Sequence, residues 1–317
     1  MIEKSDFTEI QQTVDNVFHA GELGVRQILQ SRDKKIALVV FEGDKYLMGV
    51  HTRGTFVAYY PLTQAKIEYP IKAVLMDLDG TSLYSEDFWV SVIEKTIKEL
   101  TGKKLFCVDK EDIPFVSGHS VSEHLQYCID KYCPSKDLND AIRIYYLTSR
   151  ELLNQLVNGR LHGMRIQPAF YLKEFLSYLM EKKIKVGLVT SGLYEKAYPE
   201  IWSVCSTLGI GAPEDVYDCI ITAGEPLKPH CIGTLGELSA KPHPWLYLEA
   251  ALIGLGIPVN ERSHVLGIED SGAGVCALRT AGIPAIGLRH GNIIASGLES
   301  FCIDICANLM EIKAKYL

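Results

Sequence analysis

The sequence predicts an α/β fold with a parallel sheet, and two observations support that prediction. The apolar run at residues 71–76 has the length of a strand, lies between Pro70 and Gly80, and leads into Asp77 and Asp79. Its nearly continuous hydrophobic character is typical of a strand that is buried on both faces, as in parallel sheets. Further short apolar runs alternate with segments of helical spacing downstream, which is the pattern of repeated β-α-β units.

The composition is that of an ordinary globular protein. The chain has 317 residues, 47% hydrophobic and 22% charged, enough for one large domain or two smaller ones. A net charge of −7 gives no basic excess of the kind that binds nucleic acid. We expect no membrane partner, because the apolar runs are too short to cross a bilayer, and no signal peptide is evident. The nine cysteines include no Cys-x-x-Cys pair, so we expect free thiols in a cytoplasmic protein.

The first 69 residues are expected to form a separate N-terminal α+β unit. Residues 7–29 carry helix-like apolar spacing, broken near Gly21. Residues 35–41, 46–51 and 55–62 are predicted to be a three-stranded meander. The apolar face of so small a sheet needs cover, from those helices or from a partner. We expect a structural or self-associating module, with ligand sensing as the alternative.

The rest of the chain divides into a core and an insertion. Residues 70–82 and 165–317 are expected to form the core, and residues 83–164 a helical insertion. The insertion contains three segments of helical spacing, at residues 86–100, 119–131 and 136–158. A crossover helix is expected at residues 168–182. Further core strands are expected at residues 184–189, 216–222, 264–268 and 285–288, with a last helix at 308–316.

Asp77 and Asp79 directly follow the first core strand, where open α/β sheets bind their ligands. Residues two apart on a strand share a face, so both carboxylates can reach one crevice while Leu78 turns away. Two carboxylates repel each other unless a cation or a proton lies between them. The pair therefore suits an Mg²⁺ site, a nucleophile with an acid–base partner, or both. Acids that cap the amides of a following helix are the simpler alternative.

Four motifs in sequence order resemble those of a known family. Asp-Leu-Asp-Gly-Thr at residues 77–81 resembles the first motif of the haloacid dehalogenase-like hydrolases. The later motifs are Val-Thr-Ser-Gly at 189–192, Lys-Pro-His-Pro at 241–244 and Gly-Ile-Glu-Asp-Ser-Gly at 267–272. The resemblance covers roughly residues 70–317. It implies a Rossmann-like, three-layer core with an inserted α-helical cap.

The resemblance implies an Mg²⁺-dependent phosphatase that works through an aspartyl phosphate. Asp77 would attack phosphorus, and Asp79 would give a proton to the leaving group and later take one from water. Asp77, Asp270 and the backbone carbonyl of Asp79 would hold Mg²⁺. Glu269 would support this shell or bind the ion directly.

By the same resemblance, Thr190 and Ser191 would bind the transferring phosphoryl group. Lys241 would neutralise both the nucleophile and the phosphate oxygens. A second Lys-Pro-His triplet begins at Lys228, in a long loop at residues 223–240. We choose Lys241 because a predicted helix follows it immediately, as the third motif requires.

Two alternatives to a phosphatase stay open. The chain resembles the β-phosphoglucomutase branch in its fourth motif and in residues 117–120 with Glu123, from which Gly118, His119 and Ser120 are candidate substrate contacts. It has Trp89 where that branch has a histidine. The other alternative is a catalytically silent binding module. A helical cap implies a small phosphorylated metabolite as substrate.

Overall fold

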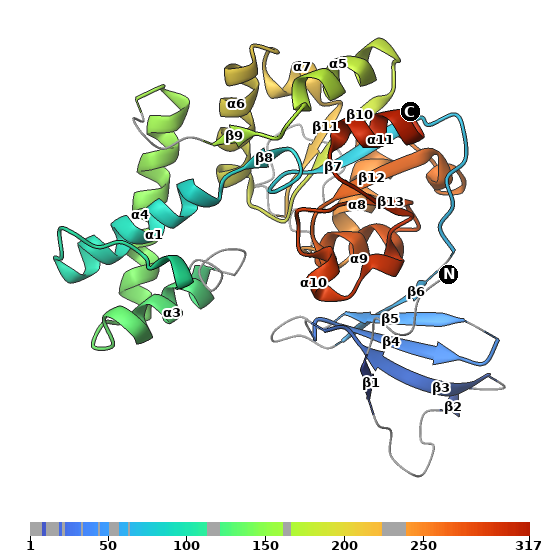
Figure 1. Ribbon diagram of the computed structural model, residues 1–317, viewed down its shortest axis with the longest axis horizontal. Helices are drawn as coiled ribbons and strands as arrows, with labels where there is room; N and C mark the ends of the chain where they lie inside the picture. Colours follow the sequence, from blue (N-terminus) through green and yellow to red (C-terminus); the bar gives the residue numbers. More distant parts are fainter. Residues whose placement is uncertain are drawn as a thin grey trace. The chain divides into compact units, whose positions relative to one another are not determined.

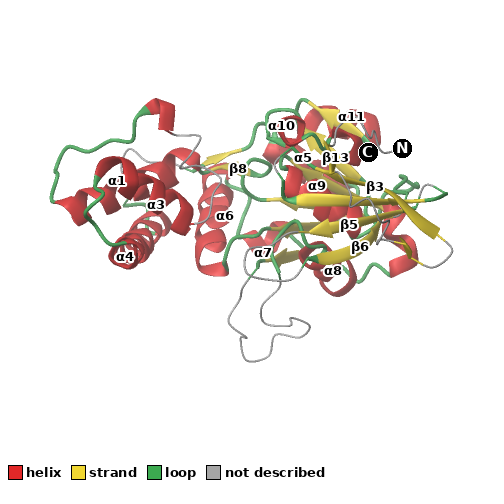
Figure 2. Cartoon of the chain, turned by 90° about the horizontal axis from the view of Figure 1, so that it is seen from below, coloured by secondary structure: helices red, strands yellow, loops and turns green. Residues whose placement is uncertain are grey.

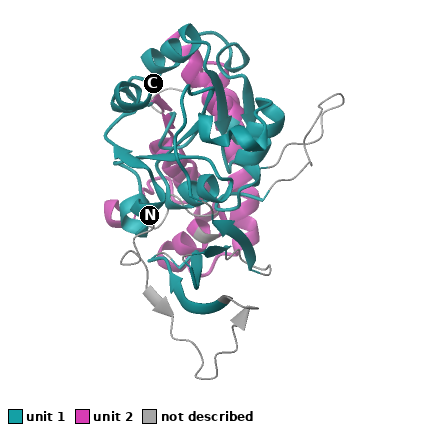
Figure 3. Ribbon diagram, turned by 90° about the vertical axis from the view of Figure 1, so that its right-hand side faces the viewer, with its two compact units in different colours: residues 1–82, 169–197, 210–317 teal, residues 83–168, 198–209 magenta. Residues whose placement is uncertain are grey.

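The computed structural model describes most of the chain. The described residues are 8–10, 19–20, 23–32, 34–43, 45–50, 57–62, 64–112, 121–160, 166–223 and 239–317. The chain divides into two compact units, which Figure 3 distinguishes by colour. Unit 1 comprises Met1–Ser82, Ala169–Ala197 and Ile210–Leu317, and unit 2 comprises Leu83–Pro168 and Tyr198–Gly209.

The core of unit 1 is a six-stranded parallel sheet, which confirms the predicted fold class (Figures 1 and 2). In spatial order its strands are β11 (Cys219–Ile221), β10 (Lys185–Val189), β7 (Ala73–Asp77), β12 (Val265–Glu269), β13 (Ala285–Leu288) and β14 (Asp304–Cys306). The first core strand, β7, is therefore central and pairs with both β10 and β12. Asp77 lies opposite Val189, so these strands reach the same edge of the sheet together. The strand β14 was not predicted.

Helices connect the parallel strands of unit 1, and a last helix follows β14. They are α5 (Leu172–Glu181), α6 (Tyr194–Leu208, which continues into unit 2), α7 (Pro213–Val216), α8 (Trp245–Glu249), α9 (Gly272–Thr280), α10 (Ile293–Ser296) and α11 (Leu309–Tyr316). A π-helical turn, Ala250–Gly254, extends α8. The crossover helix begins at Leu172 rather than at residue 168, because Gln167–Pro168 forms a short strand, β9, instead.

The N-terminal sheet also belongs to unit 1. Its strands are β1 (Thr8–Ile10), β3 (Leu23–Gln30), β4 (Ile36–Phe41), β5 (Tyr46–Val50) and β6 (Ala58–Leu62), in that order and antiparallel, with β2 (His19–Ala20) beside β3. The predicted meander is confirmed as β4, β5 and β6.

The helical expectation for residues 7–29 is wrong wherever the structure describes them. β1 and β3 are strands, and β3 pairs along its length with β4. The apolar positions of a short segment fit a helix and a strand about equally well. The neighbouring strand decides between them, because pairing satisfies the backbone amides and carbonyls of β3.

The inner face of the N-terminal sheet is covered by helices of the core. Alternate residues of β4 (Ile36, Leu38, Val40) are fully buried, as expected for one face of a strand. They share one hydrophobic cluster with residues of α8 and α9, including Tyr247 and Val275. The cover that this sheet requires thus comes from α8 and α9.

Unit 2 contains the three predicted helices, α1 (Glu86–Thr101), α3 (Val121–Tyr132) and α4 (Leu138–Val157). Helix α1 ends at Gly102, which has a left-handed backbone, and Asp137 caps α4 through the amides of Asn139 and Asp140. Strands β8 (Leu83–Tyr84) and β9 pair where the chain enters and leaves this unit. In the described part of the chain, no helix is both long and apolar enough to span a membrane.

Candidate active site

Three carboxylates converge at the carboxyl edge of the core sheet. Asp77 ends β7, Glu269 ends the neighbouring strand β12, and Asp270 follows it. One carboxylate oxygen from each of the three lies within 4.8 Å of those of the other two. The first and fourth motifs, far apart in the sequence, therefore meet at one place in space.

The ammonium group of Lys241 lies among these acids. Its Nζ is 2.5 Å from Oδ1 of Asp77 and 2.7 Å from Oε1 of Glu269, and it donates to the carbonyl of Val189 at 2.9 Å. Only 5% of this side chain is exposed. The backbone amide of Lys241 donates to Oγ of Ser191 at 3.1 Å, which links the second and third motifs. Lys228 lies outside the described residues.

Glu269 is fully buried and receives four hydrogen bonds. Its Oε1 accepts from Lys241 and, at 2.6 Å, from the hydroxyl of Tyr247. Its Oε2 accepts from the backbone amide and the hydroxyl of Ser271 at 3.2 and 3.0 Å. Ser271 also caps α9 by accepting from the amide of Gly274. This arrangement favours the supporting role for Glu269 over direct binding of an ion.

Asp270 is held close to the loop that follows β7. Its Oδ1 is 3.5 Å from the hydroxyl of Thr81, and its backbone carbonyl accepts from the amide of Asn292 at 2.9 Å. Gly80 has a φ of +87°, and a Cβ there would lie 2.2 Å from Oδ2 of Asp270. A side chain at residue 80 would therefore be strained in its backbone and would collide with this carboxylate.

The charges of the cluster do not balance. Burial raises the pKa of Asp77 well above its ordinary value, Lys241 opposes that rise, and the two neighbouring acids add to it. Burial, followed by repulsion from Glu269, raises the pKa of Asp270 to about 7. Burial disfavours the charge of Lys241, but Asp77 and Glu269 outweigh burial and raise the pKa of its ammonium. Three acids against one ammonium leave an excess of negative charge on hard oxygen donors, which fits a divalent cation such as Mg²⁺.

The carboxylate of Asp79 has a different partner. Its Oδ2 is 3.2 Å from Nζ of Lys196, and both side chains are about one-third exposed, 38% and 33% respectively. Lys196 lies in the first turns of α6, the helix that follows the second motif. Sequence reasoning missed it, although a lysine six residues after Thr190 was a visible signal.

The hydroxyl residues of the second motif follow β10. Thr190 is buried, and its Oγ1 accepts from the amide of Gly192 at 3.0 Å. Ser191 contacts Lys241 as described above. The candidate substrate contacts Gly118, His119 and Ser120 lie outside the described residues.

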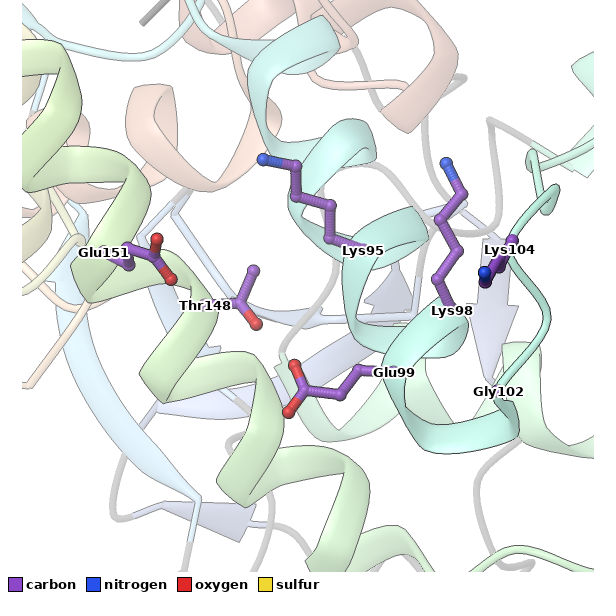
Figure 4. A pocket seen from close by; sticks show the side chains of 7 residues that line it. All are labelled: Lys95, Lys98, Glu99, Gly102, Lys104, Thr148 and Glu151. Carbon is purple, nitrogen blue, oxygen red and sulfur yellow. The ribbon is translucent and has the colours of Figure 1, made fainter. Parts of the chain in front are cut away.

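Unit 2 has a surface hollow of its own, of about 430 Å³. Lys95, Lys98 and Glu99 reach it from α1, and Thr148 and Glu151 reach it from α4 (Figure 4). Its lining mixes acids and bases on two exposed helix faces and includes none of the predicted site residues. The candidate site is therefore the one at the edge of the core sheet.

Comparison with known proteins identifies the family of the chain and shows related folds. The family model described as haloacid dehalogenase-like hydrolase matches residues 71–282. A predicted phosphoglycolate phosphatase from Haemophilus somnus is 16% identical, with a TM-score of 0.57 over 77% of this chain and 97% of that one. A candidate β-phosphoglucomutase from Thermotoga maritima is 20% identical, with a TM-score of 0.54 over 78% and 100%. CbbY from Rhodobacter sphaeroides, solved with phosphate, is 18% identical, with a TM-score of 0.53 over 77% and 96%. At these identities the three structures show a shared fold.

Proposed function

Since the chain belongs to the haloacid dehalogenase-like hydrolases, we propose that it is an Mg²⁺-dependent phosphatase that acts on a small phosphorylated metabolite. The observation that carries this proposal is the meeting of Asp77, Lys241 and Asp270 at one edge of the sheet. A nucleophile, a fixed positive charge and a set of metal-binding oxygens are the parts that phosphoryl transfer through an aspartate requires.

In the proposed reaction, an oxygen of Asp77 attacks phosphorus and the bond to the leaving oxygen breaks. Asp77, Asp270 and the backbone carbonyl of Asp79 would hold Mg²⁺, which supplies positive charge against the phosphate oxygens. Lys241 neutralises charge on Asp77 and on the transferring group from a buried position. Water then attacks the phosphorus of the aspartyl phosphate and releases inorganic phosphate.

Asp79 is the proposed acid and base, and Thr190 and Ser191 the proposed phosphate contacts. As an acid, Asp79 gives its proton to the leaving oxygen, and as a base it takes a proton from the attacking water. Lys196 fixes the direction of this carboxylate. Thr190 and the backbone amides at the start of the following helix suit the oxygens of a phosphoryl group.

A mutase would hand the phosphoryl group to a second hydroxyl of the sugar. Trp89, which replaces the histidine of the mutase branch, donates its indole N–H to Glu200 at 2.6 Å within unit 2. An indole does not take up or release a proton near neutral pH, so this position favours hydrolysis. A phosphorylated small molecule fits the phosphate found in CbbY. Self-association through residues 1–69 stays a prediction.

Hydrolysis of p-nitrophenyl phosphate with and without Mg²⁺ tests the proposal. We expect Mg²⁺-dependent release of p-nitrophenol by the parent and a loss of at least about 1,000-fold in Asp77→Asn, which lacks the nucleophilic oxygen. Incubation with a hexose 1-phosphate separates the two activities, since a phosphatase releases free phosphate and a mutase yields the 6-phosphate. A parent inactive with several divalent metals would support the silent binding module instead.

A further inference from the structure

The N-terminal sheet reaches the loop that carries Lys241. The hydroxyl of Tyr60, in strand β6, lies 2.7 Å from Nδ1 of His243, which is 183 residues further along the chain. The Tyr60 ring also packs edge-on against the rings of His243 and Trp245, with centroid distances of 5.8 and 5.9 Å. Tyr60 thus contacts two residues of the segment that leads from Lys241 into α8.

The strand itself fixes the direction of Tyr60. In β6, Tyr60 and Leu62 are half-buried and pack against the hydrophobic core, whereas their neighbours Tyr59 and Pro61 are exposed. This alternation is that of a strand with one face turned inward. Pairing of Tyr60 with Met48 in β5 sets the register. The sheet therefore presents the Tyr60 hydroxyl to the core as a consequence of its own geometry.

Both partners of this hydrogen bond are neutral groups; Tyr60 is half-buried, and His243 has little contact with water. His243 is 7% exposed, and burial lowers the pKa of its imidazole. Burial likewise raises the pKa of the Tyr60 hydroxyl. A buried imidazole nitrogen without a partner costs free energy, so the loop is most stable where Tyr60 meets it.

The same sheet also supports Lys241 through apolar packing. Tyr247, in α8, is fully buried in the hydrophobic cluster that contains Met48 and Val50 of the sheet. The Tyr247 ring lies 4.8 Å from Nζ of Lys241, and its hydroxyl bonds Glu269. The sheet therefore contacts the loop of Lys241 through Tyr60. It also shares a hydrophobic cluster with Tyr247, whose ring lies close to the ammonium of Lys241.

We propose that Tyr60 is a positioning residue, and that the N-terminal sheet holds Lys241 at Asp77 through the hydrogen bond from Tyr60 to His243. The N-terminal sheet then contributes to the active site by positioning Lys241. The kinetic half of the test rests on the proposed phosphatase function, whereas the labelling half does not.

Tyr60→Phe removes the hydroxyl and keeps the ring, and Tyr59→Phe makes the same change on the exposed face of the same strand. With p-nitrophenyl phosphate we expect Tyr60→Phe to lower kcat about tenfold with a smaller change in KM, since the loss of the partly buried hydrogen bond to His243 has about that effect. Tyr59→Phe should match the parent. His243→Asn, whose amide lies near the place of Nδ1, should recover most of the activity that His243→Phe loses.

A second experiment measures how accessible Lys241 is and does not depend on catalysis. Acetic anhydride acetylates the lysines, and peptide mass spectrometry gives the rate at Lys241 relative to the rate at the exposed Lys185. We expect labelling of Lys241 to be slow in the parent and in Tyr59→Phe, and at least about fivefold faster in Tyr60→Phe, because an ammonium held between two buried acids is protected. In a His243→Phe background, Tyr60→Phe should add no further labelling.

Unchanged labelling of Lys241 in Tyr60→Phe overturns the proposal, whatever happens to the activity. So does an additive rise in the double variant, because that would mean general loosening of the fold. If the parent is inactive but Tyr60→Phe exposes Lys241, the phosphatase function fails and the positioning role stands.

Discussion

Each unit has a buried carboxylate that contacts other charged residues. The pKa of the carboxylate is lowered in unit 2 and raised in unit 1. In unit 2, Asp112 is 3% exposed and accepts hydrogen bonds from Lys131, Tyr127 and Tyr132. The bonds from Lys131 and Tyr132 lower the pKa of Asp112 to about 2. In unit 1, the pKa of Asp77 and that of Asp270 are raised instead.

The difference lies in how many partners each acid has. Asp112 accepts from three donors, and the second acid nearby, Asp109, lies further from Lys131, at 3.9 Å. The charge of Asp112 therefore holds α3 to the short helix Lys110–Asp112. Asp77 shares Lys241 with Glu269 and has Asp270 beside it. A folded chain keeps such repulsion only where something else gains from it. A satisfied carboxylate therefore marks structure, and an unsatisfied group of carboxylates marks a site for chemistry.

The largest expected effect comes from removing the single ammonium of the unit 1 cluster. Lys241→Met should lower kcat/KM for p-nitrophenyl phosphate by at least about 1,000-fold, because among the described residues Lys241 is the one whose ammonium contacts the nucleophile. Lys241→Arg should recover little, since a planar guanidinium does not fit between two carboxylates built around a compact ammonium. A loss of less than tenfold in Lys241→Met would show that the cluster is structural, like that of Asp112.

Removal of the metal should have the next largest effect. We expect EDTA to abolish activity, and Mg²⁺ at about 100 times its dissociation constant to stabilise the parent by about 2.7 kcal/mol, seen as a rise in melting temperature. Asp270→Asn should lose both the metal-dependent activity and the rise in melting temperature with Mg²⁺, whereas Asp112→Asn should keep both. An Mg²⁺-induced rise of equal size in Asp270→Asn would place the ion elsewhere.

Replacing Asp112, in the unit 2 cluster, should lower the stability of the protein and leave its catalysis nearly unchanged. Asp112→Asn should lower the melting temperature at pH 7 and leave kcat within about threefold of the parent. Asp109→Asn is the matched control, because Asp109 is exposed and lies 3.9 Å from the same Lys131. A fall in kcat without a fall in melting temperature would contradict the assignment of Asp112 to structure.

The pH dependence of this variant follows from the lowered pKa. The stabilisation by Asp112 is complete above the pKa of about 4 in the unfolded chain, and it is lost as pH falls through about 2. The difference in melting temperature between Asp112→Asn and the parent should therefore shrink over that interval. Melting curves at pH 2, 4 and 7 measure it.

Much of the core was predictable because its signals are local. A buried strand that ends in Asp77, and another that ends before Asp270, suffice to place both acids at one edge of a parallel sheet. The choice of Lys241 over Lys228 required only the helix that follows it. The catalytic roles of these residues stay proposals, but their proximity follows from strand order.

The parts that sequence reasoning missed are set by contacts over long distances in the chain. The spacing within residues 23–30 does not reveal that β4 will pair with them, so β3 was expected to be a helix. No spacing in the sequence indicates that Tyr60 will contact His243. Lys196 was missed for a different reason, because a lysine on a helix is usually exposed to solvent, whereas here its ammonium lies 3.2 Å from Asp79.

The smallest expected effect is a rise in melting temperature when Asp270, in the unit 1 cluster, is replaced by asparagine. Asp270 has its pKa raised to about 7, so its bound proton stabilises the folded chain below pH of about 4, and this stabilisation is lost as pH rises toward about 7. Without metal, Asp270→Asn carries no charge at any pH and should melt a few degrees above the parent at pH 8 and level with it at pH 4. A lower melting temperature for Asp270→Asn at pH 8 would mean that this acid, like Asp112, stabilises the fold, and the contrast between the two clusters would fail.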